Sequence, residues 1–321
     1  MRCFPTPLAA VLTLALSVGA QAEEVTLKAV SAFADGTTFS KNFQRFVDQV
    51  NASGQGVLQI NYLGGGGKVM SPFELGKSIQ TGVVDIGNLP GAFYTNLLPE
   101  ADAMKLSAYT IQEERENGAW AFMNQLHNDK MNTQHIARQK DCVPFHLYLT
   151  KPIDKPDLSG LKLRVTPIYR AFFDALGGTS IQTAPGDVYT ALERGAVDGY
   201  GWPTQGVLDL GWHEVTKYRV DPPFYRASVE VLMNLDSWNK LDEAQKNVLN
   251  EATNWLEGLC AEDQALNQQE LQRQAEAGIQ TIEFSDELGQ QYLEQAYSAG
   301  WQAFIENNPE TGPKLQELLS Q

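Results

Sequence analysis

The sequence contains few of the residues from which most catalytic and metal sites are built. Only four of the 321 residues are histidine and three are cysteine. No two histidines have metal-ligand spacing, and there is no Cys-x-x-Cys pair and no Gly-x-Ser-x-Gly motif. The glycines at 64–67 precede Lys68, but Tyr62 and Val69 stand where a phosphate-binding loop needs Gly and Ser or Thr. We therefore expect no catalytic residue, no metal and no cofactor, although a site built from dispersed residues would leave no such motif.

Positive charge is also scarce, which bears on the class of partner. The chain has 24 Lys and Arg against 39 Asp and Glu, a formal net charge of −15. A strongly acidic protein repels nucleic acid, so we expect no nucleic-acid partner. The same field works against long-range capture of an anionic ligand, which makes a local cation more necessary. With 43% hydrophobic and 20% charged residues, the composition suits a soluble globular protein with one large or two moderate cores.

A single long apolar run occurs, and it lies at the N-terminus. Arg2 is followed by the run Leu8–Val18 and then by Ala20-Gln21-Ala22, a small-x-small cleavage signal. The run is too short to span a bilayer, which needs about 20 residues of helix. Cys3 precedes the run and so is not placed like a lipid-modified cysteine. Residues 1–22 are predicted to be the signal peptide of an exported protein that is not itself embedded in the membrane.

Two cysteines remain once the signal peptide is removed, Cys142 and Cys260. In an oxidising compartment they could form a disulfide, but the sequence cannot test the distance that this bond requires. Two separate buried thiols are an equally good interpretation, so the sequence leaves the pairing open.

Two cations interrupt a short apolar strand near the middle of the chain. Leu161, Leu163 and Val165 point to one face of this strand. Lys162 and Arg164 point to the other. On its own the pattern favours an edge strand with two solvated cations. The alternative is that Arg164 presents a planar, permanently charged fork to a carboxylate where the strand ends.

An internal repeat indicates two lobes of like construction. Residues 74–85 can be laid over residues 187–198 at a constant offset, since 187 − 74 and 195 − 82 both give 113. Each copy begins with an acidic residue, continues with helical spacing of apolar residues, and reaches a glycine, Gly82 or Gly195, before a strand. Two distant copies favour paired lobes over a solenoid, whose repeats are many and close-spaced. Two α/β lobes imply a cleft between them, where ligands bind.

Several motifs in order resemble the solute-binding proteins of tripartite ATP-independent periplasmic (TRAP) transporters, the DctP-like family. The resemblance covers nearly the whole mature chain, and its motifs are specific as a set. They are Gly160–Arg164, Asp187-Val188-Tyr189, Ala191-Leu192, Gly195–Gly199, Pro203 and, in the first half, Gly82–Asp85.

The resemblance implies how ligand-contacting residues are arranged. In the family the arginine matching Arg164 pairs with the substrate carboxylate, and the residue matching Trp202 lines the site. Some members carry a second arginine near the centre of the strand at 142–149. This sequence has none there, which suggests an aromatic wall of Phe145 or Tyr148 instead.

Two further contacts are expected from the first lobe. Asn88 lies on the lip that faces the ligand in the family, although a plain turn asparagine is an equally good interpretation. Phe33 lies in the loop after the first strand.

The expected fold is the two-lobed α/β fold of type II-like periplasmic binding proteins, with a cleft between the lobes. Residues 23–148 are assigned mainly to lobe 1 and residues 149–240 mainly to lobe 2. The chain should open with a parallel β-α-β unit. Residues 241–321 are assigned to a long bracing helix and to C-terminal helices that pack across both lobes.

The function that this reasoning predicts is that of a periplasmic subunit, not an enzyme, which captures a small organic carboxylate for a TRAP membrane permease. A secreted enzyme acting on such an acid, or a ligand-sensing subunit of a signalling receptor, are the alternatives. One arginine with aromatic neighbours fits a sugar acid, a 2-oxo acid or an aromatic acid, and fits a dicarboxylate less well. A bound metal and a dimer both occur in the wider family, and neither leaves a signature here.

Overall fold

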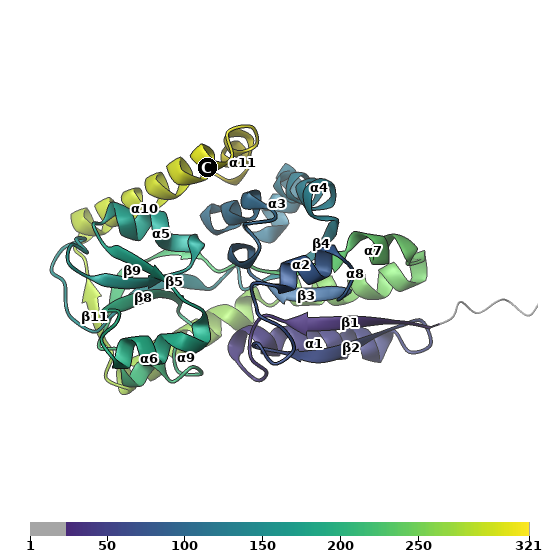
Figure 1. Cartoon of the computed structure of the whole chain (residues 1–321), viewed down its shortest axis with the longest axis horizontal. Coiled ribbons are helices and arrows are strands. Elements are labelled where there is room, and N and C mark those ends of the chain that lie inside the picture. The colour runs from purple at the N-terminus through teal and green to yellow at the C-terminus, as the bar shows by residue number, and fades with distance from the viewer. Residues whose placement is uncertain (1–23, 321) are drawn as a thin grey trace, which may run out of the picture.

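The computed structural model describes residues 24–320, and they form two β-sheets with helices packed around them (Figure 1). The signal peptide predicted at residues 1–22 lies outside the described residues. Within residues 24–320, no helix is both long and apolar enough to cross a membrane.

The first sheet has five strands in the order β2-β1-β3-β10-β4. Its strands are β1 (Val25–Ser31), β2 (Leu58–Gly65), β3 (Ile86–Leu89), β4 (Thr133–Gln139) and β10 (Val229–Asn234). β1 pairs in parallel with both β2 and β3, while β10 is antiparallel to β3 and β4. The expected parallel β-α-β opening is confirmed, with helix α1 (Thr38–Ser53) between β1 and β2.

The second sheet has six strands in the order β11-β9-β5-β8-β6-β7. Its strands are β5 (Pro144–Leu149), β6 (Lys162–Val165), β7 (Thr179–Gln182), β8 (Gly199–Pro203), β9 (Tyr218–Arg226) and β11 (Gln280–Glu283). β6 is parallel to β7 and β8, whereas β5 is antiparallel to β8 and β9.

Helices cover both sheets and connect them. In the first half of the chain they are α2 (Leu75–Gln80), η1 (Gly91–Phe93), η2 (Pro99–Leu106), α3 (Ile111–Asn117) and α4 (Ala119–Met131). In the middle they are α5 (Pro167–Ala175), η3 (Pro185–Asp187), α6 (Val188–Glu193) and η4 (Trp212–Glu214). The last are α7 (Leu235–Lys240), α8 (Glu243–Glu257), α9 (Cys260–Glu276), α10 (Asp286–Asn307) and α11 (Gly312–Leu319).

The internal repeat corresponds to the same local structure in both sheets. α2 leads to β3 and α6 leads to β8, and each helix is followed by a glycine with positive φ. Asp85 accepts the backbone N–H of Lys28 at 2.8 Å, in the middle of the neighbouring strand β1 and one residue before β1 begins to pair with β3. Asp198 accepts the N–H of Lys162 of β6 in the same way, at 3.0 Å. The repeat therefore predicts two lobes of like construction correctly.

The long helical region predicted after residue 241 is confirmed, with a break between α8 and α9. α8 packs on α1 and β4 of the first sheet. Gln274 of α9 reaches the second sheet, where its Nε2 donates to the Thr204 carbonyl at 2.7 Å. α10 lies over α5 and also contacts η2, and α11 reaches α3 and α4 (Figure 1).

Two strands do not lie in the sheet that the predicted lobe boundaries would give them. β5 belongs to the second sheet, so the chain has already crossed between β4 and β5. β10 returns to the first sheet after β9, where it fills the space between β3 and β4. This return is a non-local pairing that no local pattern near residue 229 indicates. The exact lobe boundaries stay a prediction.

A disulfide joins the first crossing segment to α9. Cys142 lies in the turn between β4 and β5, and Cys260 is the first residue of α9. Their Cα atoms are 5.4 Å apart, within the usual range for a disulfide. Nearby, the Nζ of Lys140 pairs with the buried Asp263 carboxylate at 2.6 Å. The crossing segment is thus fastened to the long helical region by a covalent bond and an ion pair.

Candidate ligand-binding site

Two neighbouring cavities lie between the sheets. The inner cavity, of about 40 Å³, is enclosed by residues from the first lobe, the second lobe and the crossing segment after β9. Its lining consists of Phe33, Phe39, Pro90, Phe93, Phe145, Thr166, Ile168, Tyr169, Trp202, Pro203, Ala227, Ser228 and Val229. The outer cavity, of about 240 Å³, includes Thr38, Asp187, Gly206 and Asp209 in its lining.

Three aromatic side chains separate the two cavities, since Phe33, Phe39 and Trp202 line both. The Phe33 and Phe39 rings are 5.1 Å apart, and Phe39 meets Trp202 edge-on at 5.9 Å. Phe33 and Phe39 come from the first lobe and Trp202 comes from β8 in the second. Because the partition is made of side chains from both lobes, separation of the lobes would open the inner cavity.

Arg164 is fully buried and lines neither cavity itself, but it contacts two residues of the inner lining, Tyr169 and Trp202. Its Nε and Nη2 both donate to the Thr183 carbonyl, at 3.1 and 2.8 Å, and its Nη1 donates to the Tyr169 hydroxyl at 2.8 Å. The guanidinium carbon also lies 5.7 Å from the centre of the Trp202 ring. β6 carries Arg164 to this position because its pairing with β7 and β8 is parallel, which places the carboxyl ends of the three strands at one edge.

The guanidinium keeps unused hydrogen-bonding capacity. It has five N–H groups, and the contacts within residues 24–320 occupy three of them, leaving one on each Nη atom. A carboxylate takes two N–H groups in a bidentate pair. Two buried donors nearby also lack a hydrogen-bond partner in the described part of the chain, the Thr166 hydroxyl and the Trp202 indole N–H. Both residues line the inner cavity, so a group that accepts hydrogen bonds is needed there.

The other predicted contact residues fall into two groups. Phe33 and Phe145 line the inner cavity together with Trp202. Asn88 and Tyr148 line neither cavity.

The carboxamide of Asn88 is fully used inside the protein. Its Nδ2 donates to Ser31 Oγ and to the Phe39 carbonyl, and its Oδ1 accepts from Gln139. Tyr148 is buried in a stack with Tyr200, with ring centroids 5.1 Å apart. Burial raises the pKa of its hydroxyl, which donates to Gln274. The hydrogen bonds of both side chains are therefore made to other groups of the protein.

The two lobes are joined directly at the mouth of the outer cavity. One carboxylate oxygen of Asp209, in the second lobe, accepts the backbone N–H of Thr38 at 2.8 Å and its hydroxyl at 2.7 Å. Thr38 is the first residue of α1, and neither the Thr37 side chain nor an acidic residue in the first turn caps this helix. Asp209 thus supplies an N-terminal cap to α1 from the opposite lobe.

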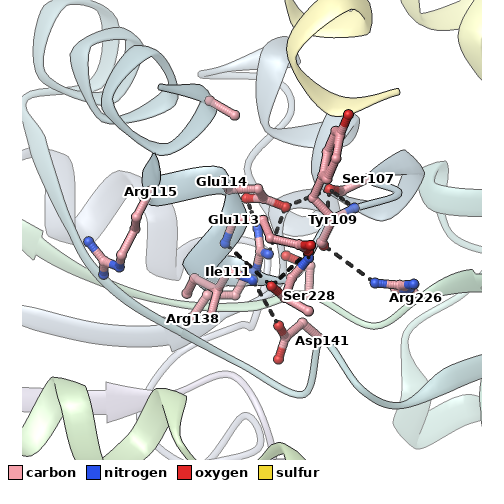
Figure 2. Close-up of polar contacts among 12 residues, drawn as sticks. Ser107, Tyr109, Ile111, Glu113, Glu114, Arg115, Arg138, Asp141, Arg226 and Ser228 are labelled. Atoms are coloured by element: carbon pink, nitrogen blue, oxygen red, sulfur yellow. Dashed lines mark hydrogen bonds and ion pairs between the residues drawn. The ribbon is translucent and has the colours of Figure 1, made fainter. Parts of the chain in front are cut away.

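A buried polar network surrounds the two segments that cross between the sheets (Figure 2). Arg138, at the end of β4, makes a bidentate pair with the buried Glu114 at 2.7 and 2.9 Å. Asp141 accepts the backbone N–H of Ile111 at 3.3 Å. On the second crossing segment, Arg226 donates to the Tyr109 carbonyl at 3.3 Å. These contacts hold both crossings against α3 and the segment that precedes it.

The sequence reasoning missed several residues that build the site. Thr166 could have been found, because it stands two positions after Arg164 in an extended segment. Phe93, Tyr169 and Thr183 gave no such signal, since their roles depend on the pairing of distant segments. The same is true of Asp209, whose partner Thr38 is 171 positions away.

Two like lobes with a cavity between them are the architecture of a solute-binding protein of the two-lobed α/β class, a class of non-enzymatic proteins. The family model "bacterial extracellular solute-binding protein, family 7" (DctP) matches residues 30–307, and the chain belongs to this family.

Individual relatives agree with this assignment. A monocarboxylate 2-oxoacid-binding periplasmic protein of Nostoc sp. is 24% identical over 257 residues, which cover 75% of this chain and 68% of the relative. An extracytoplasmic solute receptor of Bordetella pertussis that binds pyroglutamic acid has a TM-score of 0.81 at 18% identity, covering 92% of this chain and all of that chain. A TRAP solute-binding protein of Roseobacter denitrificans, with bound β-D-glucuronate, has a TM-score of 0.79 at 20% identity, with 92% and 100% covered. The expected fold is therefore confirmed.

Proposed function

We propose that this protein captures a small organic acid in the periplasm and delivers it to the membrane permease of a TRAP transporter. The observation that carries this proposal is the buried guanidinium of Arg164, which has one unused N–H on each Nη atom and contacts two residues that line the inner cavity, Tyr169 and Trp202. The ligand carboxylate would take these two N–H groups in a charge-assisted pair. The three relatives described above bind a 2-oxo acid, pyroglutamate and glucuronate, which supports an organic acid as the ligand of this protein.

The strength of this pair depends on the exclusion of water. An exposed ion pair contributes only about 0–1 kcal/mol, because water solvates and screens both charges. Arg164 is fully buried and contacts Trp202, which lines the inner cavity. A ligand held here would be sealed by the partition of Phe33, Phe39 and Trp202 when the lobes are together. Binding would thus be coupled to closure of the lobes by a hinge motion.

The interlobe bond from Asp209 to Thr38 would stabilise that closed arrangement. It joins the start of α1 to the second lobe, so it breaks when the lobes separate. The closed form would also present surface from both lobes at once, which gives a permease a means of distinguishing loaded from empty protein. Delivery to a permease is inferred from the family and from export through residues 1–22.

A thermal-shift screen of the mature protein against organic monocarboxylates tests the proposal. A ligand that binds only the folded state raises stability by about 2.7 kcal/mol at 100 times its Kd, which corresponds to a shift of several degrees. No shift with any organic acid would contradict the proposal. Turnover of the acid by the purified protein would favour a secreted enzyme instead. N-terminal sequencing of the exported protein should begin at Glu23, and an intact residue 1 would contradict the predicted cleavage.

A further inference from the structure

The inner cavity has a polar end and an apolar body. Its polar end is formed by Thr166, Tyr169 and Trp202, the lining residues next to Arg164. The Tyr169 hydroxyl accepts a hydrogen bond from the guanidinium, Trp202 lies over it, and Thr166 directly follows β6. The rest of the lining is aromatic or aliphatic, except for Ser228. It comprises Phe33, Phe39, Phe93, Phe145, Ile168 and Val229, with two prolines and an alanine.

Ser228 does not offer its hydroxyl to a ligand. The Ser228 Oγ donates to the buried carboxylate of Glu230, whose other oxygen is 2.7 Å from His135 Nε2. The hydroxyl proton is therefore committed to the protein interior. Away from Arg164, the lining side chains provide no further hydrogen-bond donor for a ligand that is already bound through its carboxylate.

Charge around the site distinguishes one acid group from two. Arg164 adjoins the inner cavity through its contacts with Tyr169 and Trp202, and the residues that line the two cavities add no Lys, Arg or His. Asp187 and Asp209 both line the outer cavity. A second carboxylate on the ligand would therefore find no further cation in either lining and would meet two anions. The site suits a single negative charge.

We infer that the ligand is a monocarboxylate whose body is apolar and unhydroxylated, such as a small aromatic, alicyclic or branched aliphatic acid. This inference rests on the proposed function and selects among the acids that it allows. Each ligand hydroxyl buried against the apolar lining would lose its hydrogen bonds to water without replacement. That loss corresponds to roughly tenfold in affinity for each hydroxyl.

A pair of ligands of similar ring size tests the inference by titration calorimetry. Cyclohexanecarboxylate and β-D-glucuronate both carry one carboxylate on a six-membered ring, but only glucuronate has ring hydroxyls. We expect cyclohexanecarboxylate to bind at least ~100-fold more tightly, on the basis of roughly tenfold for each unpaired hydroxyl. Glucuronate binding equally well or better would overturn the inference and leave the proposed function intact. If no organic acid binds, the proposed function itself fails.

A matched pair of variants tests whether the apolar lining is responsible. Phe93 lines the inner cavity, whereas Phe73 packs on Phe93 at 4.7 Å between ring centroids and lines neither cavity. Phe93→Leu should weaken binding of cyclohexanecarboxylate several-fold, because part of the apolar contact is lost, and Phe73→Leu should not. Equal effects of both variants would show that the lining does not contact the ligand body and would contradict the inference.

Discussion

Asp209→Asn tests how much of lobe closure depends on one interlobe contact. In the wild type a single carboxylate oxygen of Asp209 accepts both the N–H and the hydroxyl of Thr38 at the start of α1. Asn is about as good an N-terminal cap as Asp, so the variant keeps an acceptor oxygen for Thr38 and loses the negative charge. A negative charge at an exposed helix N-terminus contributes about 0.3–1 kcal/mol. Asp209 is exposed, so we take the upper end of this range, about 1 kcal/mol, as the loss.

That energy belongs to the closed form alone, because opening separates Thr38 from Asp209. The ratio of open to closed protein should therefore rise roughly fivefold, since 1.4 kcal/mol corresponds to a factor of ten. If the ligand is retained only in the closed form, its Kd should rise by up to the same factor. Calorimetry gives the Kd, and small-angle X-ray scattering gives the radius of gyration of ligand-free protein, which should increase.

Asp187→Asn is the control for charge. Asp187 is exposed and lines the same outer cavity, and within residues 24–320 its side chain makes no hydrogen bond to the first lobe. The Asp187→Asn variant removes one negative charge from the outer cavity, as Asp209→Asn does, but leaves the contact between Asp209 and the start of α1 intact. Thr38→Val, which keeps the N–H but loses the hydroxyl, should give a smaller effect than Asp209→Asn. If Asp209→Asn and Asp187→Asn gave the same Kd and the same scattering as wild type, the reasoning would be refuted.

Three further predictions concern stability. Cys142 and Cys260 are 118 positions apart, so reduction of their disulfide should lower the free energy of unfolding by about 2–5 kcal/mol. The stability of the double Cys→Ser variant should not change when reductant is added. Burial lowers the pKa of His127 to about 3, so between pH 6.5 and 3 the unfolded chain binds a proton that the folded protein does not. Stability should be about 2 kcal/mol lower at pH 5 than above pH 7, and a His127→Gln variant whose pH slope is unchanged would contradict this. Arg138→Met should cost about 3–5 kcal/mol in urea unfolding because it leaves Glu114 buried without its partner, whereas Arg138→Met with Glu114→Gln should cost clearly less.

The two-lobed arrangement could be predicted because its signals are local and occur twice. Each copy of the repeat carries its own helix, its own glycine turn and its own aspartate, so the pattern is visible without knowledge of the pairing. The structure adds the physical reason for the two aspartates. Asp85 and Asp198 each accept a backbone N–H of the parallel neighbour strand one residue before the pairing with that strand begins, which holds the register there.

The surroundings of Arg164 could be predicted only in part. Its place near the end of a strand follows from the apolar spacing around it. Its complete burial does not, because Thr183 and Tyr169, which bind the guanidinium, come from β7's end and from α5. Of the two residues predicted to form an aromatic wall, Phe145 lines the inner cavity and Tyr148 lines neither cavity. These two residues differ in position by an odd number, so they point to opposite faces of β5.

The contacts between the lobes could not be predicted from the sequence. The Asp209–Thr38 bond, the disulfide and the return of β10 all join segments far apart along the chain. An exposed aspartate in a turn has no local feature that identifies its partner. Such pairings depend on how the two sheets are placed, which is settled by the packing of whole elements.

The central claim, that Arg164 anchors a ligand carboxylate, is tested most directly by calorimetry of Arg164→Met with the best acid from the thermal-shift screen. Truncating one partner of a buried charge pair costs about 2–5 kcal/mol, so affinity should fall at least ~30-fold. Arg164→Lys, which keeps the charge but loses the fork, should lie between Arg164→Met and wild type. Arg170→Met, which removes an exposed cation from α5, should bind within about twofold of wild type. A folded Arg164→Met protein with wild-type affinity would contradict the account.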